Sequence, residues 1–157
     1  MFRWYEKSAI CYVYLADVET NEEWPVEDFT RKDGTFSNIA SLVKNSRWFT
    51  PGWALQELLA PTDLLFFDRC WRVFGHCNKH FYRNFQSNSV ISLGARRIDD
   101  MAELLHSITN INQTTITTPD QLKSTPAAEK LSWAAYRQTT RKEDMAYCLL
   151  VCITIPS

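Results

Sequence analysis

The sequence predicts an α/β domain, because strand-like apolar runs alternate with segments that carry helix-capping signals. A chain of 157 residues fits one ordinary domain, and its 45% apolar content is enough to bury a core. The run from Ile10 to Leu15 is rich in β-branched and aromatic residues and soon meets an aspartate, a pattern typical of a buried strand. Proline and threonine then mark the start of several helices.

The first half of the chain predicts a helix, a strand, a polar connection and a second helix. Apolar residues in Met1–Tyr5 have helical spacing and lead directly into the strand Ile10–Leu15. Residues 20–45 are polar and contain a proline and an Asp-Gly turn, so we expect a connection there. The Thr-Pro pair before Gly52 begins a helix that Pro61 stops, which predicts a helix over Pro51–Leu59.

The second half predicts more strand followed by helices. The runs "TDLLFFD" and "CWRVFG" suit two strands or one bent strand, with a strand near Leu64–Phe67, and residues 76–95 are ambiguous. Asp99 can cap a helix with one apolar face. Residues 110–120 are expected to be a loop, and a further helix should run from Thr125-Pro126 to about Tyr136.

The last predicted helix begins at a capping box formed by Thr140 and Glu143. Close to it, Arg141 and Asp144 are expected to hold the helix against the domain through ion pairs.

Composition excludes several classes of function. The 17 basic and 18 acidic residues nearly cancel, so the chain has no electrostatic case for binding nucleic acid or a charged membrane. The longest apolar run, near Tyr147–Ile155, is too short to span a bilayer, and Met1–Glu6 has no signal-peptide pattern. Five irregularly spaced cysteines are typical of reduced thiols. We therefore expect a cytoplasmic protein.

The helix Pro51–Leu59 raises the main question of function. Its leucines and Ala54 form one apolar arc, whereas Trp53 and Glu57 lie roughly 40° apart on the other side, with Gln56 beside them. In one interpretation Trp53 covers a second apolar layer and Glu57 is solvated. In the other, the indole and the carboxylate form the wall of a pocket for a polar ligand. In either interpretation, Glu57 lies away from the apolar arc, so it is expected to contribute little to the folding stability of the chain.

A metal site is not expected. Cys70, His76, Cys77 and His80 are zinc-ligand types, but adjacent His-Cys spacing fits none of the usual patterns.

Three ordered segments resemble the fungal heterokaryon-incompatibility (HET) domain family. They read "MFRWYEKSAICYVYLADV", "SRWFTPGWALQELLAP" and "LSWAAYRQTTRKEDMAYCLL". The resemblance implies a partial HET domain over residues 1–157, corresponding to the C-terminal half of the family's domain, with a family-like core at 1–110 and a helical segment at 118–152. It further implies a partial TIR-like (flavodoxin-like) parallel sheet with flanking helices, acting in programmed cell death after non-self recognition.

The departures from the family suggest a truncated chain. The family's N-terminal strand motifs have no counterpart, its usual arginine is replaced by Pro51, and the C-terminal motif is lost. We therefore expect a fragment that is inactive alone, with Tyr12, Tyr14 and Phe66 facing water on a partly uncovered sheet.

The resemblance to TIR domains also implies roles for the residues of the helix Pro51–Leu59. TIR domains that cleave NAD carry a catalytic glutamate in a motif similar to "GWALQEL", which places Glu57 as the catalytic carboxylate. Trp53 and Gln56 would then line the binding site for NAD as a substrate, with no bound cofactor. NAD cleavage is the alternative; the favoured expectation is an incompatibility module that acts through a protein partner or through self-association.

Overall fold

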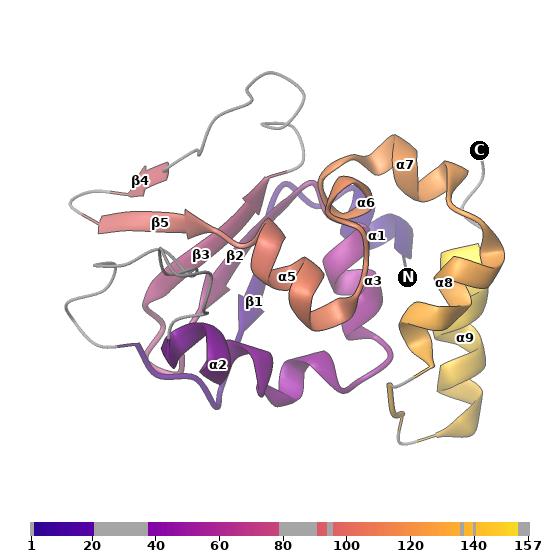
Figure 1. Ribbon diagram of the computed structural model, residues 1–157, viewed down its shortest axis with the longest axis horizontal. Helices are drawn as coiled ribbons and strands as arrows, with labels where there is room; N and C mark the ends of the chain where they lie inside the picture. Colours follow the sequence, from indigo (N-terminus) through magenta and orange to yellow (C-terminus); the bar gives the residue numbers. More distant parts are fainter. Residues whose placement is uncertain are drawn as a thin grey trace.

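The computed structural model describes residues 2–20, 38–78, 91–93, 96–135, 137–139 and 141–153. Strands form one sheet with helices packed around it (Figure 1), which confirms the α/β class. In chain order the elements are α1 (Phe2–Glu6), β1 (Cys11–Tyr14), α2 (Asn38–Lys44), the 3-10 helix η1 (Arg47–Phe49), α3 (Ala54–Leu59), β2 (Asp63–Phe67), β3 (Val73–Asn78), β4 (Ile91–Leu93), β5 (Arg96–Asp100), α5 (Ala102–Thr109), α6 (Gln113–Thr117), α7 (Pro119–Ser124), α8 (Ala127–Ala134) and α9 (Lys142–Ile153).

The sheet is mixed, which corrects the expected parallel sheet. Its strand order is β1-β2-β3-β5-β4, and β1 pairs with β2 in parallel, with Val13 opposite Phe66. The pairs β2–β3 and β4–β5 are antiparallel, while β3–β5 is parallel. The reason lies in the connections: residues 68–72 alone join β2 to β3, and a parallel pair needs a crossover of a dozen or more residues.

In β1 and β2 the core lies on one face of the sheet, whereas β3 is buried on both faces. Burial alternates along β2, where Leu64 and Phe66 are buried and their neighbours are half-buried. Leu55 and Leu58 of α3 and Leu105 of α5 belong to the same apolar cluster. Figure 1 shows α2 and α5 in front of the sheet, with α8 and α9 side by side beyond α3.

Aromatic side chains occupy the opposite face of β1 and β2. Tyr12 is 63% exposed, and Tyr14 stacks on the exposed Trp71 with ring centroids 4.5 Å apart. The Phe67 ring meets Tyr12 edge-on. The expectation that Phe66 faces water is wrong, because the strand alternation turns its side chain to the core face with Leu64.

The hairpin that places Trp71 is built on Asp68, whose side chain is fully buried. Its carboxylate accepts hydrogen bonds from the backbone N–H groups of Thr20, Cys70 and Arg72, from the Thr20 hydroxyl and from Arg72 Nε. Burial alone would raise the pKa of Asp68, but the bonds from Thr20 and Arg72 outweigh it and lower the pKa below its ordinary value. Trp71 adopts a left-handed backbone with φ 58° in this turn.

Several predicted elements agree with the structure with shifted bounds, and two do not. The strands at Ile10–Leu15 and Leu64–Phe67, the helix over Pro51–Leu59 and the helix after Thr125 correspond to β1, β2, α3 and α8. The predicted loop 110–120 is wrong, since it contains α6 and the start of α7, and the polar connection 20–45 contains α2.

Local caps explain the missed helix α6. Asn112 Oδ1 accepts hydrogen bonds from the Thr114 N–H at 3.0 Å and the Thr114 hydroxyl at 2.8 Å, which satisfies one of the free N–H groups at the start of α6. For α5, it is Asp100 rather than Asp99 whose carboxylate accepts from the Ala102 N–H. Thr140, the expected cap of α9, and Tyr136 lie outside the described residues.

Across the described ranges, no helix has the length and apolar character needed to cross a membrane.

Candidate functional site

The candidate site is built around α3, an amphipathic helix that carries Glu57 on the side opposite its apolar residues. Ala54, Leu55, Leu58 and Leu59 are buried, while Glu57 is half-buried on the side that meets α1 and η1. The preceding Ser46 caps η1, accepting a hydrogen bond from Trp48 N–H at 3.3 Å. This cap fixes the direction in which the Trp48 side chain leaves the chain.

The Glu57 carboxylate is held by two donors, one distant in the sequence and one nine residues before it. The Tyr5 hydroxyl of α1 donates to Oε1 at 3.1 Å, and the Trp48 indole Nε1 of η1 donates to Oε2 at 3.2 Å. Glu57 is therefore not the solvated side chain of the first interpretation. The expectation that it contributes little to stability is also corrected, because each donor would lose its partner if the carboxylate were removed.

Tyr5 remains a donor to Glu57 throughout the neutral and mildly alkaline range. Partial burial, then the negative charge of Glu57 and the hydrogen bond to it, raise the pKa of Tyr5 to about 12. A carboxylate has about four lone-pair positions, and Tyr5 and Trp48 use two of them. The remaining positions can accept a further hydrogen bond or face a positive charge.

Trp53 lies in different surroundings from Glu57. It is half-buried and lines a cavity of about 280 Å³. The other lining residues come from just before it in the chain, Thr50 and Pro51, and from the C-terminal part, Gln138, Thr139 and Asp144. The chain is drawn together there because the Gly52 N–H donates to Gln138 O at 3.1 Å and the Gln138 N–H donates to Thr50 O at 2.9 Å. Glu57 is not among the described residues that line this cavity.

Gln56 is completely buried with the apolar residues of α3. Neither its amide nitrogen nor its amide oxygen has a hydrogen-bond partner within the described residues. Such a buried amide costs free energy unless something satisfies it. Of the three predicted site residues, Glu57 is thus the one whose polar group is fixed by hydrogen bonds from the described residues.

Two hydrogen bonds to Asp17, which the sequence analysis did not predict, hold η1 against the end of β1. Asp17, just after β1, accepts hydrogen bonds from the Ser46 hydroxyl at 2.6 Å and the Arg47 N–H at 2.7 Å. Burial opposes ionisation of Asp17, but the bonds from Arg47 and Ser46 lower its pKa. An aspartate at a strand end and a serine before "RW" are the signals that could have suggested this bond.

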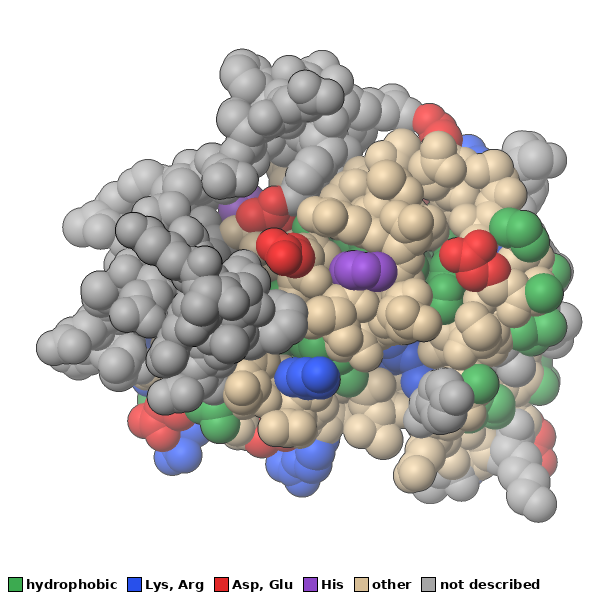
Figure 2. All heavy atoms as spheres, viewed as in Figure 1, with side chains coloured by type: hydrophobic (Ala, Val, Ile, Leu, Met, Phe, Trp, Pro, Cys, Tyr) green, Lys and Arg blue, Asp and Glu red, His purple; other side chains and the backbone are tan. Residues whose placement is uncertain are grey.

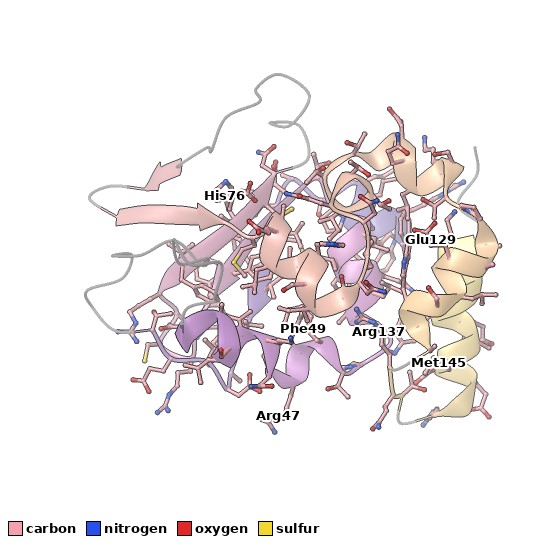
Figure 3. The ribbon with its side chains drawn as sticks, viewed as in Figure 1. Arg47, Phe49, His76, Glu129, Arg137 and Met145 are labelled. Carbon is pink, nitrogen blue, oxygen red and sulfur yellow. The ribbon has the colours of Figure 1, made fainter. Side chains whose placement is uncertain are left out.

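Arg137 ties the C-terminal helices to the same region. Its Nη1 donates to Pro51 O at 3.3 Å and its Nε to Trp133 O at 3.2 Å. Figure 3 shows Arg137 near the end of α8, on the side that faces Phe49. Gly52 packs against α9 so closely that a Cβ there would lie 3.1 Å from Cys148 Sγ. The segments 2–17, 46–61 and 131–148 therefore meet around α3.

Neither a charged patch on the face in view nor a metal-ligand cluster among the described residues marks a second site. Figure 2 shows acidic and basic side chains dispersed over the face in view. Within the described ranges, no three His, Cys, Asp or Glu side chains are placed to hold a metal ion. His76 and Cys77 are buried in β3 and Cys70 is exposed in the hairpin, while His80 lies outside the described residues.

Comparison with known proteins gives one informative similarity. The chain is 34% identical over 154 residues, 95% of its length, to the vegetative incompatibility protein HET-E-1 of Podospora anserina. It spans 9% of the length of that protein. No protein-family model matches the chain. No solved structure matches it.

Proposed function

We propose that this chain is part of a heterokaryon-incompatibility protein that acts in fungal non-self recognition and triggers programmed cell death in the cytoplasm. The observation that carries the proposal is the 34% identity to a vegetative incompatibility protein over 95% of the chain. The same proposal includes a relationship between this fold and TIR domains, although the sheet observed here is mixed and not parallel throughout.

The geometry around α3 supports this proposal. The three segments that resemble the HET family are far apart in the sequence, yet Tyr5, Trp48 and Arg137, one from each segment, all bond to the stretch Pro51–Glu57. Short motifs that contact one another in the fold are stronger evidence of a common family than isolated motifs. Contact between the motifs requires that they be correctly spaced along the chain.

We propose further that the module works through contact with a protein partner or with a second copy of itself. The aromatic surface of Tyr12, Tyr14 and Trp71 supports this, since exposed aromatic clusters are typical of interaction surfaces. Its two tyrosines lie on β1, which is an edge strand among the described strands, and Trp71 lies in the β2–β3 hairpin.

A chimera tests the proposed role. Because the relative is much longer than this chain, the matching segment of HET-E-1 would be replaced by residues 1–157, and cell death would be scored after fusion with an incompatible strain. We expect the chimera to kill the fusion cells. Survival of fusion cells that contain a folded chimera at native abundance would overturn the proposal.

A second candidate function, NAD cleavage, rests on the orientation of Glu57. Two donors fix the carboxylate, and a preorganised negative charge is suited to stabilise the cation that develops as nicotinamide leaves. Glu57 would be the catalytic residue. The expected contribution of Trp53 and Gln56 to the NAD site would require a rearrangement, because Trp53 lines a separate cavity and Gln56 is completely buried. The test is NAD loss in cells expressing the chimera: Glu57→Gln should abolish it, and Tyr5→Phe should preserve most of it. Equal NAD loss with Glu57→Gln would exclude the enzyme.

A further inference from the structure

Trp71 has a backbone conformation that disfavours its own side chain. Its φ of 58° lies in the left-handed region, where the Cβ of a bulky residue crowds the backbone. Among the described residues, the other non-glycine residue with a positive φ is Asn110, at the C-cap of α5. Asparagine is one of the residues that tolerate this conformation, and tryptophan is not. A tryptophan at position 71 therefore lowers the stability of the turn.

The turn itself does not need the indole. The Trp71 N–H donates to Asp68 O at 2.9 Å, and the N–H groups of its neighbours Cys70 and Arg72 donate to Asp68 Oδ1, each at 2.9 Å. All of these bonds use backbone donors, so an asparagine at position 71 would keep them. The hydrogen bonds that form the hairpin thus give no reason for the tryptophan.

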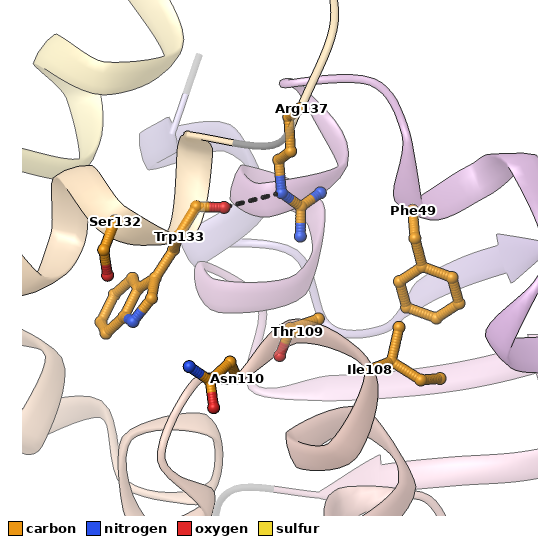
Figure 4. Close-up of a pocket in the computed structure, with 7 residues that line it drawn as sticks. All are labelled: Phe49, Ile108, Thr109, Asn110, Ser132, Trp133 and Arg137. Carbon is orange, nitrogen blue, oxygen red and sulfur yellow. Dashed lines mark hydrogen bonds between the residues drawn. The ribbon is translucent and has the colours of Figure 1, made fainter.

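The indole packs on its neighbours and still remains largely in water. It stacks on Tyr14 with centroids 4.5 Å apart and 17° between the planes, and its centroid lies 5.9 Å from that of Phe67. Trp71 is nevertheless 62% exposed, like Tyr12 at 63% on the same aromatic surface. Trp133, which lines the cavity in Figure 4, is only 6% exposed and belongs to the apolar core. An exposed indole held in a strained turn is typical of an anchor for another surface.

The charges beside the aromatic surface favour a second copy of the chain as the partner. Arg69 Nη1 lies 3.1 Å from Glu19 Oε2 in an exposed ion pair, and the Tyr14 hydroxyl donates to Arg69 O at 3.1 Å, which places this pair at the rim. A copy rotated by half a turn presents the same base and acid in the opposite order, so that base can face acid. The whole chain has a formal net charge of -1, so two copies repel each other little.

We propose that Trp71 anchors a symmetric dimer in which the aromatic surfaces of two copies face each other about a two-fold axis. This rests on the proposed function, in which the chain acts through contact with a partner or a second copy, and it names both the partner and the anchoring residue. Because the hairpin and the stack on Tyr14 already fix the indole, the side chain loses little conformational freedom when the dimer forms.

Matched substitutions separate an anchoring role of Trp71 from a structural one. Sedimentation velocity over a concentration series measures dimerisation of the whole chain, and Trp71→Asn should weaken the dimer roughly tenfold or more. In urea unfolding at a concentration where the native chain is monomeric, Trp71→Asn should be at least as stable as the native chain, because relief of the backbone strain offsets the lost stack on Tyr14. Trp71→Tyr keeps a ring and should still dimerise. Trp4→Asn makes the same change at a tryptophan that is 82% exposed on α1, and should leave the dimer unchanged.

Cys70 reports where the two copies meet. It is exposed and directly precedes Trp71, so its modification by N-ethylmaleimide, followed by mass spectrometry, should slow as the protein concentration rises and the dimer forms. In Trp71→Asn the rate should stay constant over the same concentrations.

Three results would overturn the dimer: a native chain that is monomeric at every concentration, an equal loss of dimer with Trp4→Asn and Trp71→Asn, or a Trp71→Asn chain that unfolds more easily and still dimerises. A monomeric chain whose HET-E-1 chimera kills would remove the dimer and keep the proposed function. A dimer that depends on Trp71, in a chain whose chimera fails to kill, would remove the proposed function and keep the dimer.

Discussion

At the scale of the residue, Glu57 links parts of the chain that are distant in sequence. Its two donors come from α1 and η1, so the carboxylate connects α3 to the start of the chain and to the short helix just before α3. A glutamate on the polar side of an amphipathic helix is usually solvated, and the sequence singled it out because Trp53 shared its side and because its motif resembles that of TIR domains. Its partner Tyr5 is 52 positions away, and no local pattern predicts such a pair.

The bond between Tyr5 and Glu57 can be measured by a double-mutant cycle. Tyr5→Phe removes one donor, Glu57→Gln removes the charge, and urea unfolding of the four proteins should give a coupling free energy of about 1 kcal/mol, because a hydrogen bond to a charged group contributes more than a neutral one. Glu6→Gln, an exposed carboxylate on the same helix as Tyr5, serves as the control for charge removal. Purely additive effects of the two substitutions would mean that the residues do not interact.

At the scale of the element, the sequence predicted strands and long helices better than connections. The apolar runs of β1 and β2 can be recognised in the sequence because polar residues bound them. In the structure, buried and more exposed side chains alternate along both strands. The helices α6 and α7 were missed because their threonines, asparagine and proline are typical of loops, and here the same residues act as caps. The antiparallel β2–β3 pair was missed because the family resemblance outweighed the short connection between the two strands.

The β2–β3 hairpin should be the acid-sensitive element of the fold. Asp68 has a lowered pKa in the folded chain, so its hydrogen bonds and its ion pair with Arg72 contribute stability at neutral pH that is lost as the pH falls from the ordinary aspartate pKa through the lower folded value. As the pH is lowered from about 6 to about 2, the melting temperature should fall steeply for the native protein and less steeply for Asp68→Asn.

The Asp68→Asn protein should also be less stable at neutral pH, because Arg72 keeps a charge without its partner. An identical acid profile in the two proteins would assign the acid sensitivity to other carboxylates.

At the scale of the whole molecule, an aromatic surface on an edge strand predicts self-association. Tyr12 is 63% exposed and Trp71 62%, and β1 has β2 on one side only among the described strands. Sedimentation equilibrium should show a mass that rises with protein concentration. Tyr12→Lys, which places a charge on the strand edge, should shift the chain toward the monomer.

Tyr147→Lys is the matched control for this association, because Tyr147 is also exposed, at 58%, but lies on α9. A native chain that stays monomeric at all concentrations, or an equal response to both lysine substitutions, would show that the β1 surface does not mediate contact.

The central claim is that Glu57 serves a death-inducing module beyond its part in the fold. The most direct measurement is the fraction of fusion cells killed by the HET-E-1 chimera carrying native residues, Glu57→Ala or Tyr5→Phe, with a melting curve for each chain. Tyr5→Phe removes one bond to the carboxylate but keeps the carboxylate itself. We predict killing by the native and Tyr5→Phe chimeras and a loss of roughly a hundredfold or more in the death rate for a folded Glu57→Ala chimera, in line with the removal of a preorganised charge. Full killing by folded Glu57→Ala would contradict the claim and leave Glu57 as a structural link between α1, η1 and α3.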